Sequence, residues 1–281
     1  MKGVRRYRGA YTARQIAATF GLVLACLLFL YPMALMAINS FKSDAEMYMN
    51  PAGLPRAWTL ESYGKIFKYH GGLWWNYVNS VVIAASSTVL AVFLSALAAF
   101  AFAKYRFRGR NLIFSLLLAT MMVPPEIVIP GLYVLFAKLQ WINTLRAQIL
   151  PTITPVLGLF LIRQYMLDIP DSLLEAARLD GASEWRVFWQ IVLPLSKPAL
   201  LTVMIFTVLR EWNDFMGPLI YLTSEGNRTL ALGLAHLKGV QGTEWGLLMA
   251  ASLLMVLPAL LLFFVAQRFF IEGIALTGTK A

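Results

Sequence analysis

Apolar residues along this chain gather into long uninterrupted runs and do not alternate with polar residues. Several runs approach the length of about 20 residues that a helix needs to cross the hydrocarbon core at about 1.5 Å per residue. They cover Gln15–Ile38, Trp75–Ala103, Ala147–Tyr165, Pro198–Leu222 and Trp245–Gln267. A transmembrane β-barrel would alternate apolar and polar positions instead. The pattern predicts an all-α protein that crosses a membrane several times.

A further apolar region is interrupted by prolines. The run from Asn111 to Val123 is short, Pro124 and Pro125 break it, and the sequence continues apolar as "IVIPGLYVLFAKL". Two interpretations remain open. The region is either one kinked crossing followed by an outer interfacial helix, or two short crossings. The first interpretation gives six transmembrane helices.

Basic residues flank the apolar runs and indicate an orientation. Two clusters stand out: Lys2, Arg5, Arg6, Arg8 and Arg14, and then Lys104, Arg106, Arg108 and Arg110. Such clusters favour the cytoplasmic side of a membrane. With six spans, both termini and the segment at about 168–197 are cytoplasmic. Topology thus explains the net charge of +10 without a nucleic-acid partner.

The first apolar run has a second interpretation, because a cleaved signal peptide also pairs a basic segment with an apolar one. The sequence "ALMA" resembles a cleavage site for such a peptide. The run from Ile16 to Ile38 is, however, longer than a usual signal core. We therefore expect it to remain as a transmembrane helix.

Composition indicates a membrane protein, and the motifs that the sequence lacks argue against an active site on this chain. Hydrophobic residues make up 59% of the 281 residues and charged residues 14%, against roughly a quarter charged in soluble domains. The single cysteine, Cys26, and the two histidines, His70 and His236, offer neither a disulfide framework nor a metal cluster. The phosphate-binding pattern G-x-x-x-x-G-K-[ST] and the metalloprotease pattern H-E-x-x-H are both absent from the sequence. We predict no catalytic residue, no metal ligand and no ATPase site on this chain.

One polar stretch, "LLEAARLDGASEWRVFWQIVLPLSKPAL" from Leu173 to Leu200, separates two apolar runs. Ser172 and Glu175 have the spacing of a capping box, which begins a helix. Gly181 is suited to ending that helix. Ser183 can cap a second helix that stops near Pro194. The stretch predicts two short helices joined by a sharp glycine turn.

The charges of this stretch leave two interpretations open. Leu173, Leu174 and Ala177 are spaced to share one helical face, which directs Glu175, Arg178 and Asp180 elsewhere. The stretch is either a membrane-surface hairpin with solvated charges or a projection that docks in a groove of a partner. Periodicity does not distinguish between them.

The same stretch resembles the glutamate-alanine-alanine ("EAA") loop of permease subunits of bacterial ABC importers. The matching positions are Glu175, Ala176, Ala177, Gly181, Ile191, Leu193 and Pro194. In that family the loop is the coupling helix that sits in a cleft of a separate ATP-hydrolysing subunit. The resemblance implies that these residues couple the chain to such an ATPase.

Other segments resemble the carbohydrate-uptake branch of that family, similar to the six-span permease subunit of maltose transporters. They are "NTLRAQILP", "FLIRQYMLDIPDS", "LPLSKPAL" and "EWNDFMGPLIYL". The resemblance implies a type I ABC importer transmembrane domain over 72–268, with its coupling loop at about 168–197. Residues 1–71 would supply a cytoplasmic N-terminus, the first span and an extracytoplasmic loop, and 269–281 a cytoplasmic tail.

The implied function is import of a sugar or related polyol across the cytoplasmic (inner) membrane. The implied partners are a second, homologous permease subunit, two ATPase subunits and an extracytoplasmic solute-binding protein, within membrane lipid. ATP and Mg²⁺ would be bound by the ATPase, and this chain would hold no cofactor. The tail from Thr277 to Ala281 would reach the ATPase subunits. Alternatives are a permease for a non-sugar solute, and a secondary transporter or membrane enzyme.

The predicted fifth span contains polar residues that offer a route for the solute: Arg210, Glu211, Trp212, Asn213 and Asp214. Charges facing lipid are costly, so they should face the bundle or an aqueous cavity. Arg210 and Asp214 have the i, i+4 spacing of an ion pair. The group either holds this span against its neighbours or lines a translocation path, where an aromatic ring and an amide suit a sugar. Glu126 is likewise either a helix-end anchor or a gate element.

Overall fold

The computed structural model describes residues 13–68, 72–239 and 242–278. The basic residues before Tyr11, together with His70 and the last residues of the tail, lie outside these ranges. The described chain is helical apart from a two-stranded sheet of β1 (Lys238–Gly239) and β2 (Gly242–Thr243). It forms two compact units, one of residues 1–65 and 243–253 and the other of residues 66–242 and 254–281.

The first unit contains α1 (Ala13–Asn39), α2 (Asp44–Met49), most of α3 (Glu61–Lys68) and the start of α15 (Trp245–Gly278). The fully buried Lys42 Nζ donates to the carbonyl oxygens of Asn50 at 2.6 Å and Gly53 at 2.7 Å, which closes the loop after α1.

The same loop is tied to the first turn of α15. The Gly246 N–H donates to Asp44 at 2.9 Å, and Lys65 forms ion pairs with Asp44, Glu61 and Glu244 at 2.9, 3.2 and 3.0 Å. Since Lys65 faces three carboxylates, its pKa lies well above its ordinary value, chiefly because of the hydrogen bond to Asp44.

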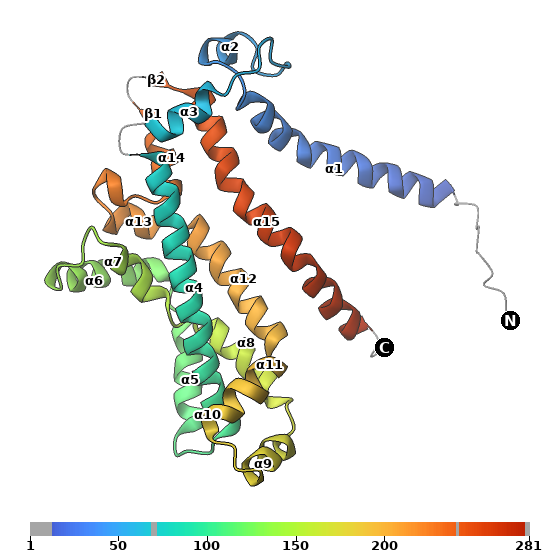
Figure 1. Cartoon of the computed structure of the whole chain (residues 1–281), viewed down its shortest axis with the longest axis vertical. Helices are drawn as coiled ribbons and strands as arrows, with labels where there is room; N and C mark the ends of the chain where they lie inside the picture. The colour runs from blue at the N-terminus through green and yellow to red at the C-terminus, as the bar shows by residue number, and fades with distance from the viewer. Residues whose placement is uncertain (1–12, 69–71, 240–241, 279–281) are drawn as a thin grey trace. The chain divides into compact units, whose positions relative to one another are not determined.

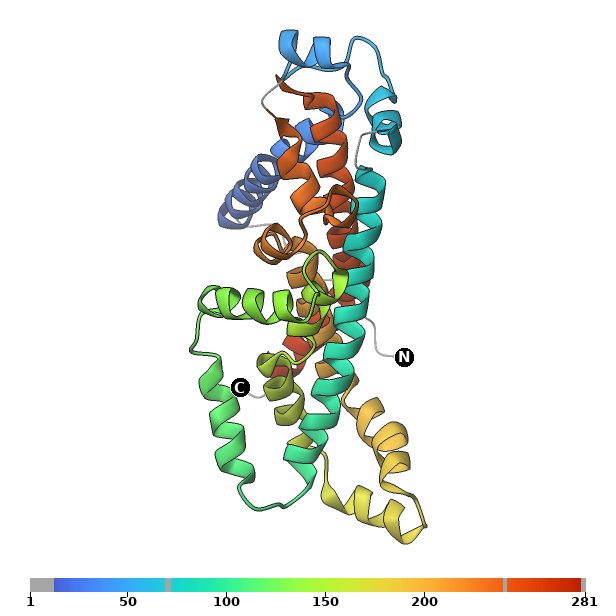
Figure 2. The ribbon, with the colours of Figure 1, turned by 90° about the vertical axis from the view of Figure 1, so that its left-hand side faces the viewer.

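The second unit is organised around α4 (Leu73–Lys104), along which α8 (Val156–Leu167) and α12 (Lys197–Asn213) pack (Figures 1 and 2). Small residues recur every three or four positions on the buried side of α4: Ser80, Ala84, Ser87, Ala91, Ser95, Ala99 and Ala103. Small side chains let helix backbones approach closely within a membrane. This explains why the neighbouring helices pack against α4.

The prediction of a helical membrane protein is confirmed. Four helices are long and apolar enough to cross a membrane, at Gln15–Asn39, Leu73–Lys104, Leu145–Leu167 and Trp245–Val265, and the number rises to six if each of two bent helix pairs is one span. The bent pairs are Arg110–Thr120 with Pro125–Lys138, at 96°, and Glu184–Leu195 with Lys197–Asn213, at 77°.

The proline break after the short apolar run lies where the sequence predicts it, between α5 (Arg110–Thr120) and α6 (Pro125–Lys138). Pro124 has an extended backbone, as a residue before proline should, and Pro125 begins α6. Figure 2 shows α6 running across the direction of α4, which favours one crossing followed by an interfacial helix. Glu126 is exposed in the first turn of α6, where a carboxylate suits the helix dipole.

Two predicted spans are not continuous helices. The fourth consists of α7 (Leu145–Ile149), the 3₁₀ turn η1 (Leu150–Thr152) and α8, with irregular backbone between η1 and α8. The fifth was predicted to reach Leu222, which is wrong, because α12 ends at Asn213 and α13 (Met216–Tyr221) follows a break. Pro218 lacks the N–H that would bond to Asp214 in a continuous helix, which explains this second break.

Two further elements, η3 (Glu225–Asn227) and α14 (Leu230–His236), follow α13 and lie beside the N-terminal half of α4. The last helix, α15, continues past the predicted end at Gln267 to Gly278, so the backbone of the predicted tail is helical up to that residue.

Candidate functional site

The polar stretch forms a hairpin of α9 (Asp171–Leu179), α10 (Glu184–Val187), the π-helical turn η2 (Phe188–Val192) and α11 (Leu193–Leu195). Gly181 has φ +81°, a left-handed conformation that favours glycine. The Ala182 N–H donates to the Ala177 carbonyl at 2.9 Å and the Gly181 N–H to the Arg178 carbonyl at 3.0 Å. This is the Schellman arrangement that ends a helix. The predicted helix, glycine turn and helix are confirmed.

The two predicted caps have different outcomes. Ser183 caps α10 as predicted, since its side chain accepts the Arg186 N–H at 3.4 Å. Ser172 does not cap α9. That helix begins one residue earlier, at Asp171, after Pro170 in an extended conformation. The proline sets the start of the helix in place of a side-chain cap.

One face of the hairpin is anchored in the core of the second unit. Leu174, Val187 and Phe188 are at most 1% exposed and join the cluster that contains Phe100 of α4 and Met166 of α8. The hairpin therefore lies at the C-terminal end of α4 (Figure 1). Leu173 was predicted to share a helical face with Leu174, but its side chain is 48% exposed, whereas Leu174 is 1% exposed.

Polar contacts clamp the hairpin to the last turn of α4. Lys104 Nζ donates to the Ile169 carbonyl at 2.5 Å and forms an ion pair with Asp171 at 2.7 Å. The Tyr105 hydroxyl donates to Glu184, which also pairs with Arg178 at 2.8 Å. From the sequence, Lys104 was predicted only as a topology signal, and this clamp was not predicted. A basic residue in the last turn of a span, followed by a tyrosine, was the available signal.

The clamp shifts the titration of its members. Burial and the hydrogen bond to Glu184 raise the pKa of Tyr105 to about 12, so the hydroxyl stays a donor at neutral pH. Hydrogen bonds from Arg178 and then Tyr105 lower the pKa of Glu184. The hydrogen bond from Lys104 lowers the pKa of Asp171.

These shifts predict that acid loosens the hairpin. A carboxylate with a lowered folded-state pKa stabilises above its unfolded pKa, near 4, and loses that contribution as pH falls through the folded value. We expect hydrogen-exchange protection of α9 to hold from neutral pH to about 4 and to decline below it. In Lys104→Gln, protection should be lower at neutral pH and its acid dependence shallower. The effect should be small, because Asp171 is 74% exposed. Identical profiles for this variant and the parent would contradict the clamp, and Asp168→Asn is the matched control.

The other face of the hairpin is exposed. Glu175, Asp180 and Arg186 are exposed, and Leu179 is 89% exposed. Of the remaining positions that carry the family resemblance, Ala176 and Pro194 are exposed, and Ala177, Ile191 and Leu193 are half-buried. The hairpin thus presents a free surface on an anchored base.

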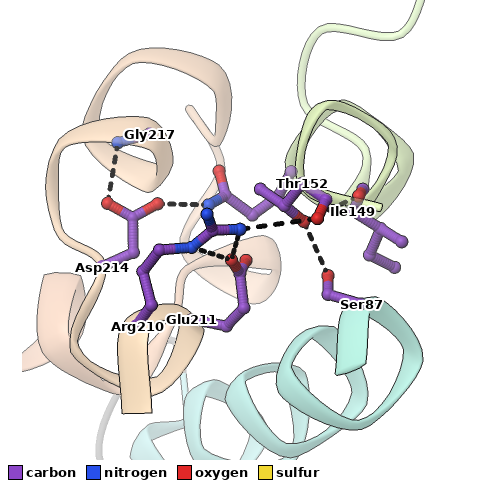
Figure 3. Close-up of polar contacts among 8 residues, drawn as sticks. Ser87, Ile149, Thr152, Arg210, Glu211, Asp214 and Gly217 are labelled. Carbon is purple, nitrogen blue, oxygen red and sulfur yellow. Dashed lines mark hydrogen bonds and ion pairs between the residues drawn. The ribbon is translucent and has the colours of Figure 1, made fainter. Parts of the chain in front are cut away.

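The second candidate group lies where α12 ends (Figure 3). Arg210 does not pair with Asp214 as predicted. Its guanidinium pairs instead with Glu211, through Nε at 2.9 Å and Nη2 at 2.8 Å. The predicted i, i+4 geometry fails because the helix ends at Asn213. The Glu211 side chain is 1% exposed, whereas that of Arg210 is 51% exposed.

Further hydrogen bonds join this group to the break between α7 and α8. Arg210 Nη2 donates to the Thr152 carbonyl at 3.4 Å, and the Thr152 hydroxyl donates to Ser87 of α4 at 3.1 Å. Asp214 accepts hydrogen bonds from Gln148 Nε2 and from the Gly217 N–H. Gln148, which is buried, was missed, although a glutamine inside an apolar run was a visible signal. Figure 3 shows these side chains meeting between three segments of the chain.

Two predicted path residues differ in accessibility. Trp212 is 5% exposed, and its indole N–H donates to the Met255 carbonyl of α15 at 2.8 Å. This ring is covered in the present conformation. Asn213 is exposed and donates to the Leu209 carbonyl at 2.8 Å. Within the described ranges, no three histidine, cysteine or carboxylate side chains group as metal ligands.

Comparison with known proteins gives consistent matches. Residues 65–275 match the family described as binding-protein-dependent transport system inner membrane component. The chain is 37% identical to the arabinooligosaccharides transport system permease protein AraQ of Halalkalibacterium halodurans, over 93% of this chain and 95% of that protein. It is 32% identical to the sn-glycerol-3-phosphate transport system permease protein UgpE of Yersinia pestis, over 90% and 93%. A crystal structure of a bacterial ABC transporter involved in alginate import contains a chain that superposes with a TM-score of 0.81 at 21% identity, over 93% of this chain and 99% of that one.

Proposed function

Because the chain belongs to the family of binding-protein-dependent transport system inner membrane components, we propose that it is a permease subunit of an ATP-driven importer for a sugar or related polyol. The observation that carries the proposal is the hairpin, whose base is buried against α4 while Glu175 and Leu179 face outward. The choice of solute class rests on relatives named for arabinooligosaccharides and for glycerol-3-phosphate.

In this proposal the exposed hairpin face docks in a cleft of a separate ATPase subunit, which binds ATP and Mg²⁺. The coupling residues are Glu175, Ala176, Ala177, Gly181, Ile191, Leu193 and Pro194. A second, homologous permease subunit carries the other ATPase subunit, and an extracytoplasmic binding protein delivers the solute. ATP is assigned to the separate subunit because the phosphate-binding loop pattern is absent from this sequence.

The clamp gives the hairpin a mechanical connection to the transmembrane helices. Lys104, Tyr105 and the buried Leu174 fix it to α4, which in turn packs along α8 and α12. Displacement of the hairpin by the ATPase therefore moves α4 rather than bending a flexible loop. Alternation of access requires two such packed arrangements of the helices. The path for the solute would pass Asn213 and the Arg210–Glu211 pair.

We propose that the importer domain spans 72–268, with both termini, the 269–281 tail and the hairpin in the cytoplasm. Single-cysteine labelling tests this orientation. In a Cys26→Ser background, Leu179→Cys places a thiol at a strongly exposed hairpin position. A membrane-impermeant maleimide should label it only after the cells are permeabilised. A matched variant, Trp58→Cys in the loop after α1, should be labelled in intact cells. Labelling of the Leu179→Cys variant in intact cells would reverse the proposed topology.

The solute class is tested by deleting this subunit alone and measuring uptake of a panel of labelled sugars, polyols, amino acids and phosphate. Loss of uptake of one sugar or polyol, restored by the intact chain, is the expected result. Loss of only a non-sugar solute would favour the alternative of a different importer class. An unchanged panel in the deletion strain would argue against import altogether.

A further inference from the structure

The turn between α4 and α5 borders a basic cavity that is open to the surface and that the coupling mechanism does not use. Its volume is about 450 Å³, and Arg106, Phe107, Gly109, Arg110, Asn111 and Leu112 line it. The cavity contains the first turn of α5 and lies next to the clamp, because Arg110 Nη1 donates to the Tyr105 carbonyl at 3.1 Å.

The positive charge in this cavity is only partly offset by the chain, through the electrostatic attraction between Arg106 and Asp171. Neither Arg106 nor Arg110 forms an ion pair with any residue that the structure describes, and the same is true of Arg108 beside them. The carboxylates nearby are already engaged, Asp171 by Lys104 and Glu184 by Arg178. Arg110 also repels Arg163 electrostatically. The cavity therefore favours an anionic occupant.

The start of α5 has neither a side-chain cap nor an acidic residue in its first turn. Its N-cap is Gly109, at φ +81°, which has no side chain to accept a hydrogen bond. Arg110 instead adds positive charge at the positive end of the helix dipole. The N–H groups of Asn111 and Leu112 have no acceptor among the described residues. An anion in the cavity would satisfy these donors and offset the charge.

The surface that continues from the cavity is apolar. Leu112, Ile113 and Leu116 of α5 are 66%, 44% and 59% exposed, and α5 belongs to one of the bent pairs that can cross the membrane. An occupant with a charged head and an apolar tail matches both parts of this surface. A free anion would use only the first part.

We propose that this cavity binds the phosphate of an anionic phospholipid, with Arg106 and Arg110 on the phosphate oxygens and the acyl chains along α5. Arginine suits this role, because its planar fork donates two hydrogen bonds to a phosphate at once. The site differs from general attraction of basic loops to anionic membranes, since it depends on particular arginines.

The chain offers a matched pair of variants. Arg106→Gln removes a cavity arginine that makes no hydrogen bond or ion pair with the described chain, so its fold should survive. Arg108→Gln removes the same charge from the same turn, but Arg108 does not line the cavity. The full chain in detergent is titrated with phosphatidylglycerol, with phosphatidylcholine and with inorganic phosphate, and bound lipid is counted by native mass spectrometry.

We expect phosphatidylglycerol to bind the parent chain and Arg108→Gln alike, and Arg106→Gln at least about tenfold more weakly, as loss of a charge-assisted hydrogen bond implies. Equal weakening in both variants would overturn the site, because it would show a response to loop charge alone. Phosphatidylcholine or inorganic phosphate binding as tightly as phosphatidylglycerol would overturn the assignment to an anionic lipid. The measurement involves neither ATPase nor solute, so its failure would leave the proposed transport function untouched.

Discussion

Reversing the charge of Glu175 should uncouple ATP hydrolysis from transport without unfolding the chain. Glu175 is exposed on α9, and it makes no hydrogen bond or ion pair with the rest of the described residues. Glu175→Lys therefore removes nothing that stabilises this subunit. In the proposed docked state it places a repelling charge in a closed interface, where loss of a charged contact costs about 2–5 kcal/mol. We expect uptake to fall by at least about tenfold, with the ATPase lost from the purified complex.

The comparison must separate a docking contact from a general effect of charge. Asp168→Lys makes the same change at another exposed carboxylate, three residues before α9 begins. Uptake should stay near that of the parent in this control. If Glu175→Lys retained both the ATPase and full uptake, the hairpin would not be the docking surface, although it forms the predicted helix, glycine turn and helix.

Replacement of Gly181 should act through the backbone, in contrast to Glu175. Its φ of +81° costs other residues roughly 1–2 kcal/mol, although a Cβ there would meet no neighbouring atom within 4 Å. A substituted residue would avoid this conformational cost by changing the turn, and with it the angle between α9 and α10.

A local motif was sufficient to predict the hairpin, because a glycine turn and a serine cap each act within a few residues of sequence.

The transmembrane helices were also predictable where the signal was apolar length alone. The bounds of α1 and α4 differ from the predicted runs by a few residues, because the length of an uninterrupted apolar run is itself the signal for a membrane span. The break before α6 was also predicted, because proline acts on the backbone close to its own position and its effect is therefore visible in the sequence.

Most of the predictions that failed concern contacts between distant segments. The break after α12 also has a local cause, Pro218, which the predicted run to Leu222 overlooked. The end of α12 at Asn213 is further stabilised by Gln148 and by the Gly217 N–H, which both bond to Asp214. Gln148 is far from Asp214 in sequence, so no periodicity within the span reveals the contact. The clamp of Lys104 on Asp171 was missed for the same reason. These contacts depend on how α4, α7 and α9 pack, which is tertiary information.

Because Arg210 pairs with the buried Glu211 and not with Asp214, replacing Arg210 should lower the stability of the chain. Glu211 is 1% exposed, and Arg210 is the cation that pairs with it in the structure. Arg210→Met would leave a buried carboxylate without a counter-charge, a change that typically costs about 3–5 kcal/mol. Because Arg210 is itself half exposed, we expect the free energy of unfolding to fall by about 3 kcal/mol, near the lower end of that range. The variant should lose most of its folded fraction on mild heating in detergent, measured by size exclusion.

A double variant distinguishes a structural pair from a path residue. Arg210→Met with Glu211→Gln removes both charges, so much of the stability should return, since the uncompensated charge causes most of the loss. Uptake should not return with it if the pair also contacts the solute. Asn213→Ala changes an exposed side chain whose one hydrogen bond within the described ranges goes to Leu209 of its own helix, so it should lower uptake without changing stability. If the double variant recovered stability and uptake together while Asn213→Ala had no effect, the group would hold α12 in place, and the solute would pass elsewhere.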